Sequence, residues 1–267
     1  MPDLSQRIFY RVPDMERVRV QRDVVYRRVD DADLLMDVYA LPDVRAGKQM
    51  PAVVFVHGGP IASEMRPKDW GVYQSYGELV AASGLIGVTF NHRFFSRESL
   101  AEAERDICAA VDYVRAHADE LRVDPDRLCV WVFSGGGPFL SWVLCERPPF
   151  VRCIAAYYAL LDLRHMLPSD ADDALKQRAA KFSPAAHVAN AGDLPIFVAR
   201  AGQDRPSLNQ GTDSFVREAL AANAPLELMN HPHGQHAFDV LNDDARTREI
   251  IARTLAFIKT HLYAQNP

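Results

Sequence analysis

A serine lies where an apolar run meets a cluster of glycines. Residues 128–133 (LCVWVF) are all apolar, and Ser134, three glycines and Pro138 follow them. The apolar run predicts a buried strand, and the apolar spacing that resumes after Pro138 predicts a helix. We therefore expect Ser134 on a sharp strand-to-helix turn, at the sheet edge where open α/β sheets bind their ligands. The N-terminus of the helix would add positive potential there.

A serine hydroxyl is a weak nucleophile and needs a base. His236 stands in the sequence GQHAF, after the last apolar run, and Asp204 follows the run PIFVAR. Because each of the three residues follows a predicted strand, all three could meet at one edge of the sheet and support acyl transfer. Asp162 also follows a strand and is an alternative acid, whereas Asp239, close to His236 in sequence, is expected to be a local partner.

Acyl transfer also requires donors for the oxyanion of the tetrahedral intermediate. The sequence VFVHGGP ends an early strand, and Gly59 can present its N–H without obstruction, whereas Pro60 has none. We predict that the N–H groups of Gly59 and Gly135 form the oxyanion hole. His57 is expected to be a hydrogen-bonding residue of this loop.

The aromatic pair in NHRFF, which follows another predicted strand, could line the cleft. Phe94 and Phe95 are candidate walls of a substrate pocket, and core packing is the alternative. The histidines of HPHGQH match no zinc-binding spacing, so we expect loop hydrogen bonds rather than a metal site.

Strand-like and helix-like segments alternate along most of the chain. A sheet built from them is expected to be mostly parallel and doubly wound, because the apolar runs mostly lack strict alternation. The apolar runs lie at 52–57, 84–90, 128–133, 152–158, 195–200 and 225–230, and helical spacing at 70–83, 99–121, 209–222 and 244–262. Residues 23–41 predict an antiparallel hairpin at a sheet edge, and VDPDRLCV a turn before the third apolar run.

The length of 267 residues is within the range of one α/β domain. We assign residues 22–267 to that domain and residues 1–21 to an N-terminal arm. The polar stretch 161–183 interrupts the alternation and is predicted to form a small cap over the carboxyl edge of the sheet.

Composition excludes several classes of function. The net charge is −5, and the 30 basic residues are scattered, which argues against nucleic-acid or anionic-membrane partners. No apolar run approaches the ~18 residues of a membrane span. The charged N-terminus has no signal-like apolar stretch, and the four cysteines form no C-x-x-C pair; both favour a cytoplasmic protein. The oligomeric state leaves no mark in the sequence.

Four segments in this order, HGGP, FSGGG, AGQD and GQHAF, resemble the landmarks of the α/β-hydrolase superfamily. The resemblance covers residues 22–263 and is closest to carboxylesterases, including feruloyl-esterase-like and dienelactone-hydrolase-like members. It implies the α/β-hydrolase fold: a mostly parallel sheet of about eight strands with helices on both faces. It also favours Asp204 over Asp162, because most members place the acid in this turn.

The resemblance has one departure from the usual G-x-S-x-G motif, in which Val132 occupies the first glycine position. We expect Gly137 to relieve the resulting crowding. The implied function is ester hydrolysis through Ser134, His236 and Asp204, with no cofactor and a small-molecule ester as substrate. An exopeptidase or amidase with the same triad, or a non-catalytic ligand-binding protein, is the alternative.

Overall fold

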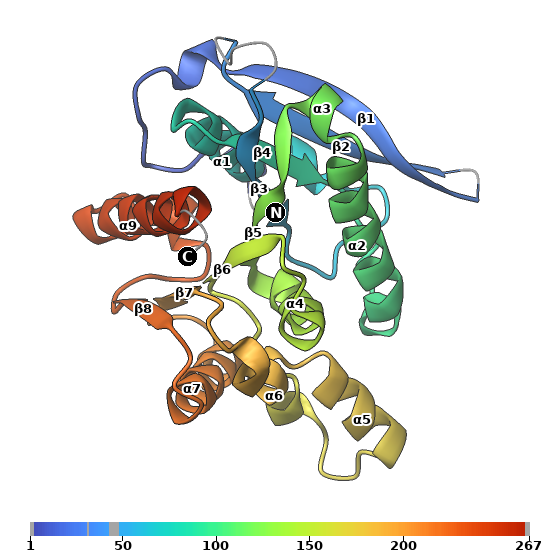
Figure 1. Cartoon of the computed structure of the whole chain (residues 1–267). Helices are drawn as coiled ribbons and strands as arrows, with labels where there is room; N and C mark the ends of the chain where they lie inside the picture. The colour runs from blue at the N-terminus through green and yellow to red at the C-terminus, as the bar shows by residue number, and fades with distance from the viewer. Residues whose placement is uncertain (1–2, 31, 43–47, 265–267) are drawn as a thin grey trace.

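A single eight-stranded sheet forms the centre of the computed structural model, which describes residues 3–30, 32–42 and 48–264 (Figure 1). The strand order is β1-β2-β4-β3-β5-β6-β7-β8. The strands are β1 (Arg19–Val29), β2 (Ala32–Ala40), β3 (Met50–Val56), β4 (Ile86–Phe90), β5 (Val123–Phe133), β6 (Val151–Tyr157), β7 (Ile196–Ala201) and β8 (Leu226–His231).

The sheet is mostly parallel. Strands β4, β3 and β5 to β8 run parallel to their neighbours, whereas β1 pairs antiparallel with β2, and β2 antiparallel with β4. The predicted edge hairpin and the predicted fold class are both confirmed.

Helices cover both faces of the sheet, as Figure 1 shows. Helices α1 and α9 pack on one face, and α2, α4, α6 and α7 on the other. The helices are α1 (Gly71–Ala82), α2 (Leu100–Ala116), α3 (Ala118–Leu121), α4 (Leu140–Glu146), α5 (Asp173–Lys181), α6 (Pro184–His187), α7 (Pro206–Ala221), α8 (Phe238–Leu241) and α9 (Ala245–Tyr263).

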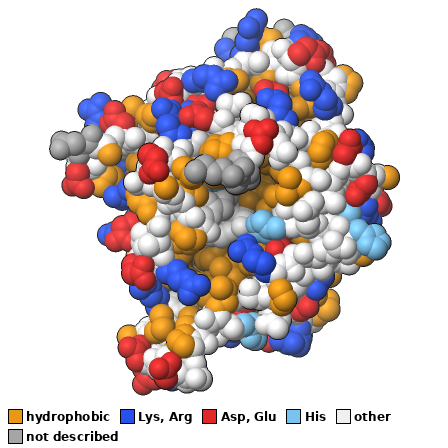
Figure 2. Space-filling model, turned by 180° about the vertical axis from the view of Figure 1, so that it is seen from behind, with side chains coloured by type: hydrophobic (Ala, Val, Ile, Leu, Met, Phe, Trp, Pro, Cys, Tyr) orange, Lys and Arg blue, Asp and Glu red, His pale blue; other side chains and the backbone are white. Residues whose placement is uncertain are grey.

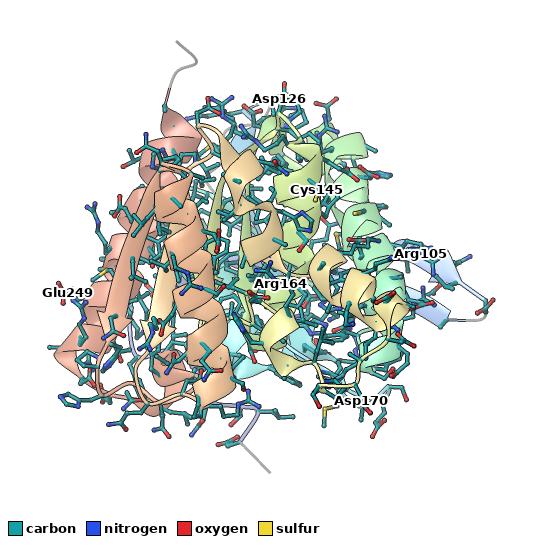
Figure 3. All side chains as sticks on the ribbon, turned by 90° about the horizontal axis from the view of Figure 1, so that it is seen from below. Arg105, Asp126, Cys145, Arg164, Asp170 and Glu249 are labelled. Carbon is teal, nitrogen blue, oxygen red and sulfur yellow. The ribbon has the colours of Figure 1, made fainter. Side chains whose placement is uncertain are left out.

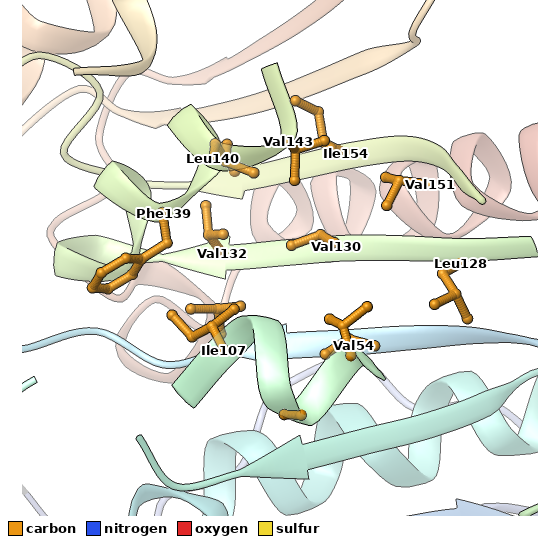
Figure 4. Close-up of a cluster of buried hydrophobic side chains, with 14 of the residues drawn as sticks. Val54, Ile107, Leu128, Val130, Val132, Phe139, Leu140, Val143, Val151 and Ile154 are labelled. Atoms are coloured by element: carbon orange, nitrogen blue, oxygen red, sulfur yellow. The ribbon is translucent and has the colours of Figure 1, made fainter. Parts of the chain in front are cut away.

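The interior strands bury both of their faces. Along β3, Val54 and Val56 pack in the cluster under α2 and α4, while Val53 and Phe55 pack in the cluster under α1 and α9. Successive side chains point to opposite faces of a strand, so a strand covered on both sides needs apolar residues at every position. Figure 4 shows part of the first cluster.

Two predicted boundaries were wrong. The helix predicted over 99–121 is interrupted at His117, whose backbone leaves the helical region (φ −106°, ψ 26°) while its ring stacks on Tyr113. The turn predicted in VDPDRLCV belongs to β5, because Val123 already pairs with Met50. The pairing of β3 with β5 is irregular between Met50 and Ala52, and the turn-like residues of β5 lie opposite this irregularity.

The N-terminal segment packs against α1. Ile8 and Met15 are buried there, and the N–H of Gly71 donates to the carbonyl of Leu4 at 2.8 Å. Strand β1 begins at Arg19, inside the arm predicted over 1–21. Over the described ranges, no helix has the length and apolar character required to cross a bilayer.

Candidate active site

Ser134 occupies the turn between β5 and the short helical segment Ser134–Phe139. Its φ is 50°, in the left-handed region that non-glycine residues rarely adopt. The N–H of Leu160 donates to its carbonyl at 2.8 Å and helps to hold this conformation. The predicted strand-to-helix turn is present, and it projects the hydroxyl beyond the carboxyl end of the sheet.

The three glycines after Ser134 allow close backbone approaches. A Cβ on Gly135 would lie 2.0 Å from the carbonyl oxygen of Gly59, and one on Gly136 2.8 Å from that of Val56. A Cβ on Gly137 would lie 2.3 Å from the carbonyl oxygen of Leu160. The expectation that Gly137 relieves crowding around Val132 was therefore wrong: Gly137 makes room for the chain after β6.

Val132 fits the core without that relief. Its side chain is fully buried in the cluster that contains Ile107, Phe139 and Leu140 (Figure 4). Phe139 and Leu140, which follow the turn, lie in the same cluster as this valine. The side chain at the position usually occupied by glycine is thus accommodated in the apolar core.

The structure brings Ser134, His236 and Asp204 into hydrogen-bonding succession. Ser134 Oγ lies 2.9 Å from His236 Nε2, and His236 Nδ1 lies 2.7 Å from Asp204 Oδ2. Because an ionised carboxylate can only accept hydrogen bonds, Nδ1 carries the proton and donates it to Asp204. The lone pair of Nε2 is then available to accept the hydroxyl proton of Ser134.

Backbone hydrogen bonds join the loops that carry the acid and the histidine. The N–H of Gly202 donates to the carbonyl of His231 at 2.8 Å, and that of Gln203 to the carbonyl of Gly234 at 2.9 Å. Asp204 is almost completely buried, whereas the side chain of His236 is one-third exposed. The carboxylate is thus shielded, while the imidazole faces the open side of the site.

The two alternative acids contact other groups. Asp162 accepts hydrogen bonds from Arg164 at 2.7 and 2.8 Å and from Ser214 at 2.9 Å. Figure 3 shows Arg164 in the middle of this face of the molecule, between helices.

Asp239 accepts hydrogen bonds from the hydroxyls of Tyr76 and Tyr158, at 2.8 and 3.0 Å. Burial raises the pKa of this carboxyl to about 6, although the two hydroxyls oppose the shift. The ring of Tyr158 also meets the His236 imidazole edge to face, with centroids 4.9 Å apart. The sequence analysis missed Tyr158, because a tyrosine directly after a strand is expected to be a buried core residue.

The loop after β3 approaches the serine turn. The N–H of Gly58 donates to the hydroxyl of Tyr73 at 3.1 Å, so it is already engaged. Gly59, joined to Pro60 by a cis peptide bond, lies against Gly135. Gly59 and Gly135, the two residues predicted to form the oxyanion hole, thus lie side by side at the cavity that Ser134 lines.

His57 stabilises that loop as a neutral side chain. Its Nε2 accepts the N–H of His92 at 3.3 Å, so Nδ1 is protonated and donates to the carbonyl of Gly58 at 2.7 Å. Burial lowers the pKa of His57 to about 4.

Comparison with known proteins shows which family and which solved structures this chain is similar to. Residues 36–144, less than half of the chain, match the model of the BD-FAE family. The esterase Est2 of Thermogutta terrifontis, solved with propionate, superposes with a TM-score of 0.74 at 21% identity, over 96% of this chain and 98% of that one. The chain has the α/β-hydrolase fold.

Two further proteins with similarity to this α/β-hydrolase-fold chain are also esterases by name. Esterase B of Lactobacillus rhamnosis (HN001) superposes with a TM-score of 0.72 at 17% identity, over 95% of this chain and 88% of that one. The probable carboxylic ester hydrolase LipM of Mycobacterium tuberculosis (strain ATCC 25618 / H37Rv) is 24% identical over 258 residues. The matched region covers 86% of this chain and 59% of LipM.

A cavity of about 450 Å³ opens beside Ser134 in this α/β-hydrolase fold. Its apolar walls include Phe94 and Leu208 together with Leu163, Met166 and Leu175 of the stretch 161–183. In Figure 2 the surface is hollowed beside the lobe at lower left, with a hydrophobic floor and basic side chains at its edges. Of the two predicted pocket residues, Phe94 lines this cavity, whereas Phe95 is 39% exposed and outside it.

The remaining histidines of HPHGQH have other surroundings. His231 is buried, with its Nε2 3.2 Å from Thr247 Oγ1 and 3.2 Å from Asp244, and His233 is exposed. No group of three or more potential metal ligands occurs in the ranges the structure covers.

Proposed function

We propose that this protein hydrolyses carboxylic esters through an acyl-enzyme on Ser134. The observation that carries the proposal is the continuous row of hydrogen bonds from Ser134 through His236 to Asp204. Similarity to proteins named as esterases supports the reaction class.

In the first half of the reaction, Ser134 Oγ attacks the ester carbonyl carbon while His236 Nε2 takes the hydroxyl proton. Asp204 stabilises the imidazolium that forms and keeps the ring in the correct tautomer. The new C–O bond places negative charge on the former carbonyl oxygen, which the N–H groups of Gly59 and Gly135 bind. Each such donor lowers the barrier by about 3 kcal/mol.

The tetrahedral intermediate then collapses. The bond to the leaving alcohol breaks as the imidazolium returns its proton to the leaving oxygen, and an acyl-serine remains. Water attacks this ester in the second half, His236 again takes the proton, and the carboxylic acid leaves while Ser134 regains its hydrogen.

Hydrolysis of short p-nitrophenyl esters tests the proposal. We expect steady turnover by the wild type and a loss of several orders of magnitude in Ser134→Ala, because the attacking atom is removed. Ser169→Ala, on an exposed loop, is the matched control and should keep wild-type activity. Equal activity of the wild type and Ser134→Ala would contradict the mechanism.

A further inference from the structure

The charged side chains that line the cavity include more basic than acidic residues. Arg97, Arg178 and Arg205 contribute three positive charges, and Glu98 is the one carboxylate among the lining residues. The arginines come from three places: the turn before α2, helix α5, and the residue before α7. An otherwise apolar cavity therefore has a positively charged rim.

Arg178 is joined to the backbone of the turn that carries Arg97. Arg178 Nη2 donates to the carbonyl oxygen of Arg97 at 2.6 Å, which joins α5 to the turn before α2. Within the described ranges, neither guanidinium forms an ion pair with an acidic side chain. By contrast, Arg105 on the outside of α2 pairs with Glu102 at 3.2 Å, and Lys181 of α5 pairs with Glu104 at 3.0 Å.

The remaining charges leave this excess in place. Arg205 Nε is 3.8 Å from Asp204, so that carboxylate balances its charge, and the Arg205 side chain is 68% exposed. A hydrogen bond with Ser96, assisted by the charges of Arg178 and Arg97, lowers the pKa of Glu98 and keeps it ionised. With Asp204 set against Arg205, the single carboxylate of Glu98 stands against Arg97 and Arg178, and a net positive charge remains.

Guanidinium groups bind carboxylates strongly, since their planar N–H groups match the two carboxylate oxygens. The cavity that Ser134 and these arginines line also offers the apolar surface of Leu163, Met166 and Leu175. A ligand that suits both parts has an ester carbonyl at one end, a short hydrocarbon chain, and an anion at the other end.

We propose that the substrates are monoesters of dicarboxylic acids, with the free carboxylate bound by Arg97 and Arg178. This inference rests on the proposed esterase function. The apolar wall binds the methylene chain, the arginine pair fixes the distal carboxylate, and the ester carbonyl is thereby placed at Ser134.

The test compares kcat/KM for ethyl hydrogen adipate and ethyl hexanoate, which differ mainly in the terminal carboxylate. We expect the wild type to prefer the anionic ester by about tenfold, the factor that corresponds to about 1.4 kcal/mol. Arg97→Gln and Arg178→Gln should each remove most of that preference, and added salt should weaken it. Glu98→Gln should increase the preference, because it removes the competing anion.

Arg105→Gln is the matched control: it deletes the same charge outside the cavity and should leave the preference unchanged (Figure 3). Because the readout is a ratio of two substrates on one preparation, partial unfolding of a variant cancels. Hydrolysis of ethyl hexanoate with no preference for the anionic ester, or a preference that survives both arginine substitutions, would overturn this inference alone. Failure to hydrolyse either ester would overturn the proposed function and the inference with it.

Discussion

Asp204 determines how His236 presents its two nitrogens. Its carboxylate accepts the Nδ1 proton at 2.7 Å, which leaves Nε2 free to act as a base toward Ser134. Asp162, equally plausible from its place after a strand, forms its hydrogen bonds with Arg164 and Ser214 instead. The choice between the two acids depends on loop geometry that residue order alone does not contain.

We expect Asp204→Asn to lower kcat by about 10³- to 10⁴-fold, because an amide can donate to Nδ1 and favour the wrong tautomer. Asp162→Asn provides the comparison, since it removes a buried carboxylate of the same kind. Asp162→Asn should reduce the free energy of unfolding, and its loss in kcat should be smaller than that of Asp204→Asn. A larger loss of kcat in Asp162→Asn than in Asp204→Asn would show that Asp162 is the acid of the site.

Asp239 makes stability depend on pH. Its pKa is raised to about 6 by burial, above the usual 3.8, so the folded state binds its proton more tightly than the unfolded state does. This contribution is fully present below pH ~4 and is lost as pH rises through ~6, with a total of about 3 kcal/mol.

Asp239→Asn removes that titration. We expect the difference in unfolding free energy between the wild type and Asp239→Asn to shift by about 2 kcal/mol from pH 4 to pH 6.5, with the wild type losing its advantage. Urea unfolding across this range measures the shift. A constant difference between the two proteins would show that Asp239 titrates normally.

At the scale of elements, short apolar runs predicted the six parallel strands. Five of these are interior strands, and a strand covered by helices on both faces needs apolar residues throughout, whereas β8 lies at the edge and is only partly buried. The break at His117 and the start of β5 at Val123 were not predictable in this way. Both depend on local contacts, namely the stacking on Tyr113 and the pairing with Met50, that periodicity does not register.

The residues of the candidate site also divide into those that the sequence could predict and those that it could not. Ser134, His236, Asp204 and Gly59 could be proposed from the sequence because the chemistry of acyl transfer needs those residue types after strands. Tyr158 could not, because a tyrosine directly after β6 is expected in the core. Arg97 and Arg178 could not, because they reach the cavity only when the loop after β4 and the segment 161–183 fold over the sheet.

Val132→Gly would restore the usual glycine of the serine turn, but we expect it to destabilise the protein by about 3 kcal/mol. The substitution leaves a cavity among Ile107, Phe139 and Leu140 and adds backbone freedom to β5. Val25→Gly, half-buried on the edge strand β1, is the control and should lose less. An unchanged or higher melting temperature for Val132→Gly would contradict this description of the turn.

At the scale of the whole molecule, the N-terminal segment is packed as part of the domain. Ile8 and Met15 are buried against α1, and the N–H of Phe9 donates to the carbonyl of Asp239 at 3.2 Å, next to the histidine loop. We propose that residues 3–18 fold together with the sheet rather than as a separate arm.

Removing residues 1–18 should therefore lower the free energy of unfolding by about 4 kcal/mol, the sum for two buried apolar side chains. The double substitution Ile8→Ala and Met15→Ala should reproduce much of this loss in the full-length chain. If the shortened protein unfolds at the same urea concentration as the full-length protein, the segment contributes nothing to the domain.

We propose that folding makes Ser134 nucleophilic through His236. Reaction with a fluorophosphonate, followed by mass mapping of the modified peptide, tests it most directly, because only an activated serine reacts rapidly. We predict rapid modification of Ser134 in the wild type and loss of that modification in His236→Ala, with both proteins folded. An unmodified wild type, or modification of Ser134 at the same rate without the imidazole, would contradict the account.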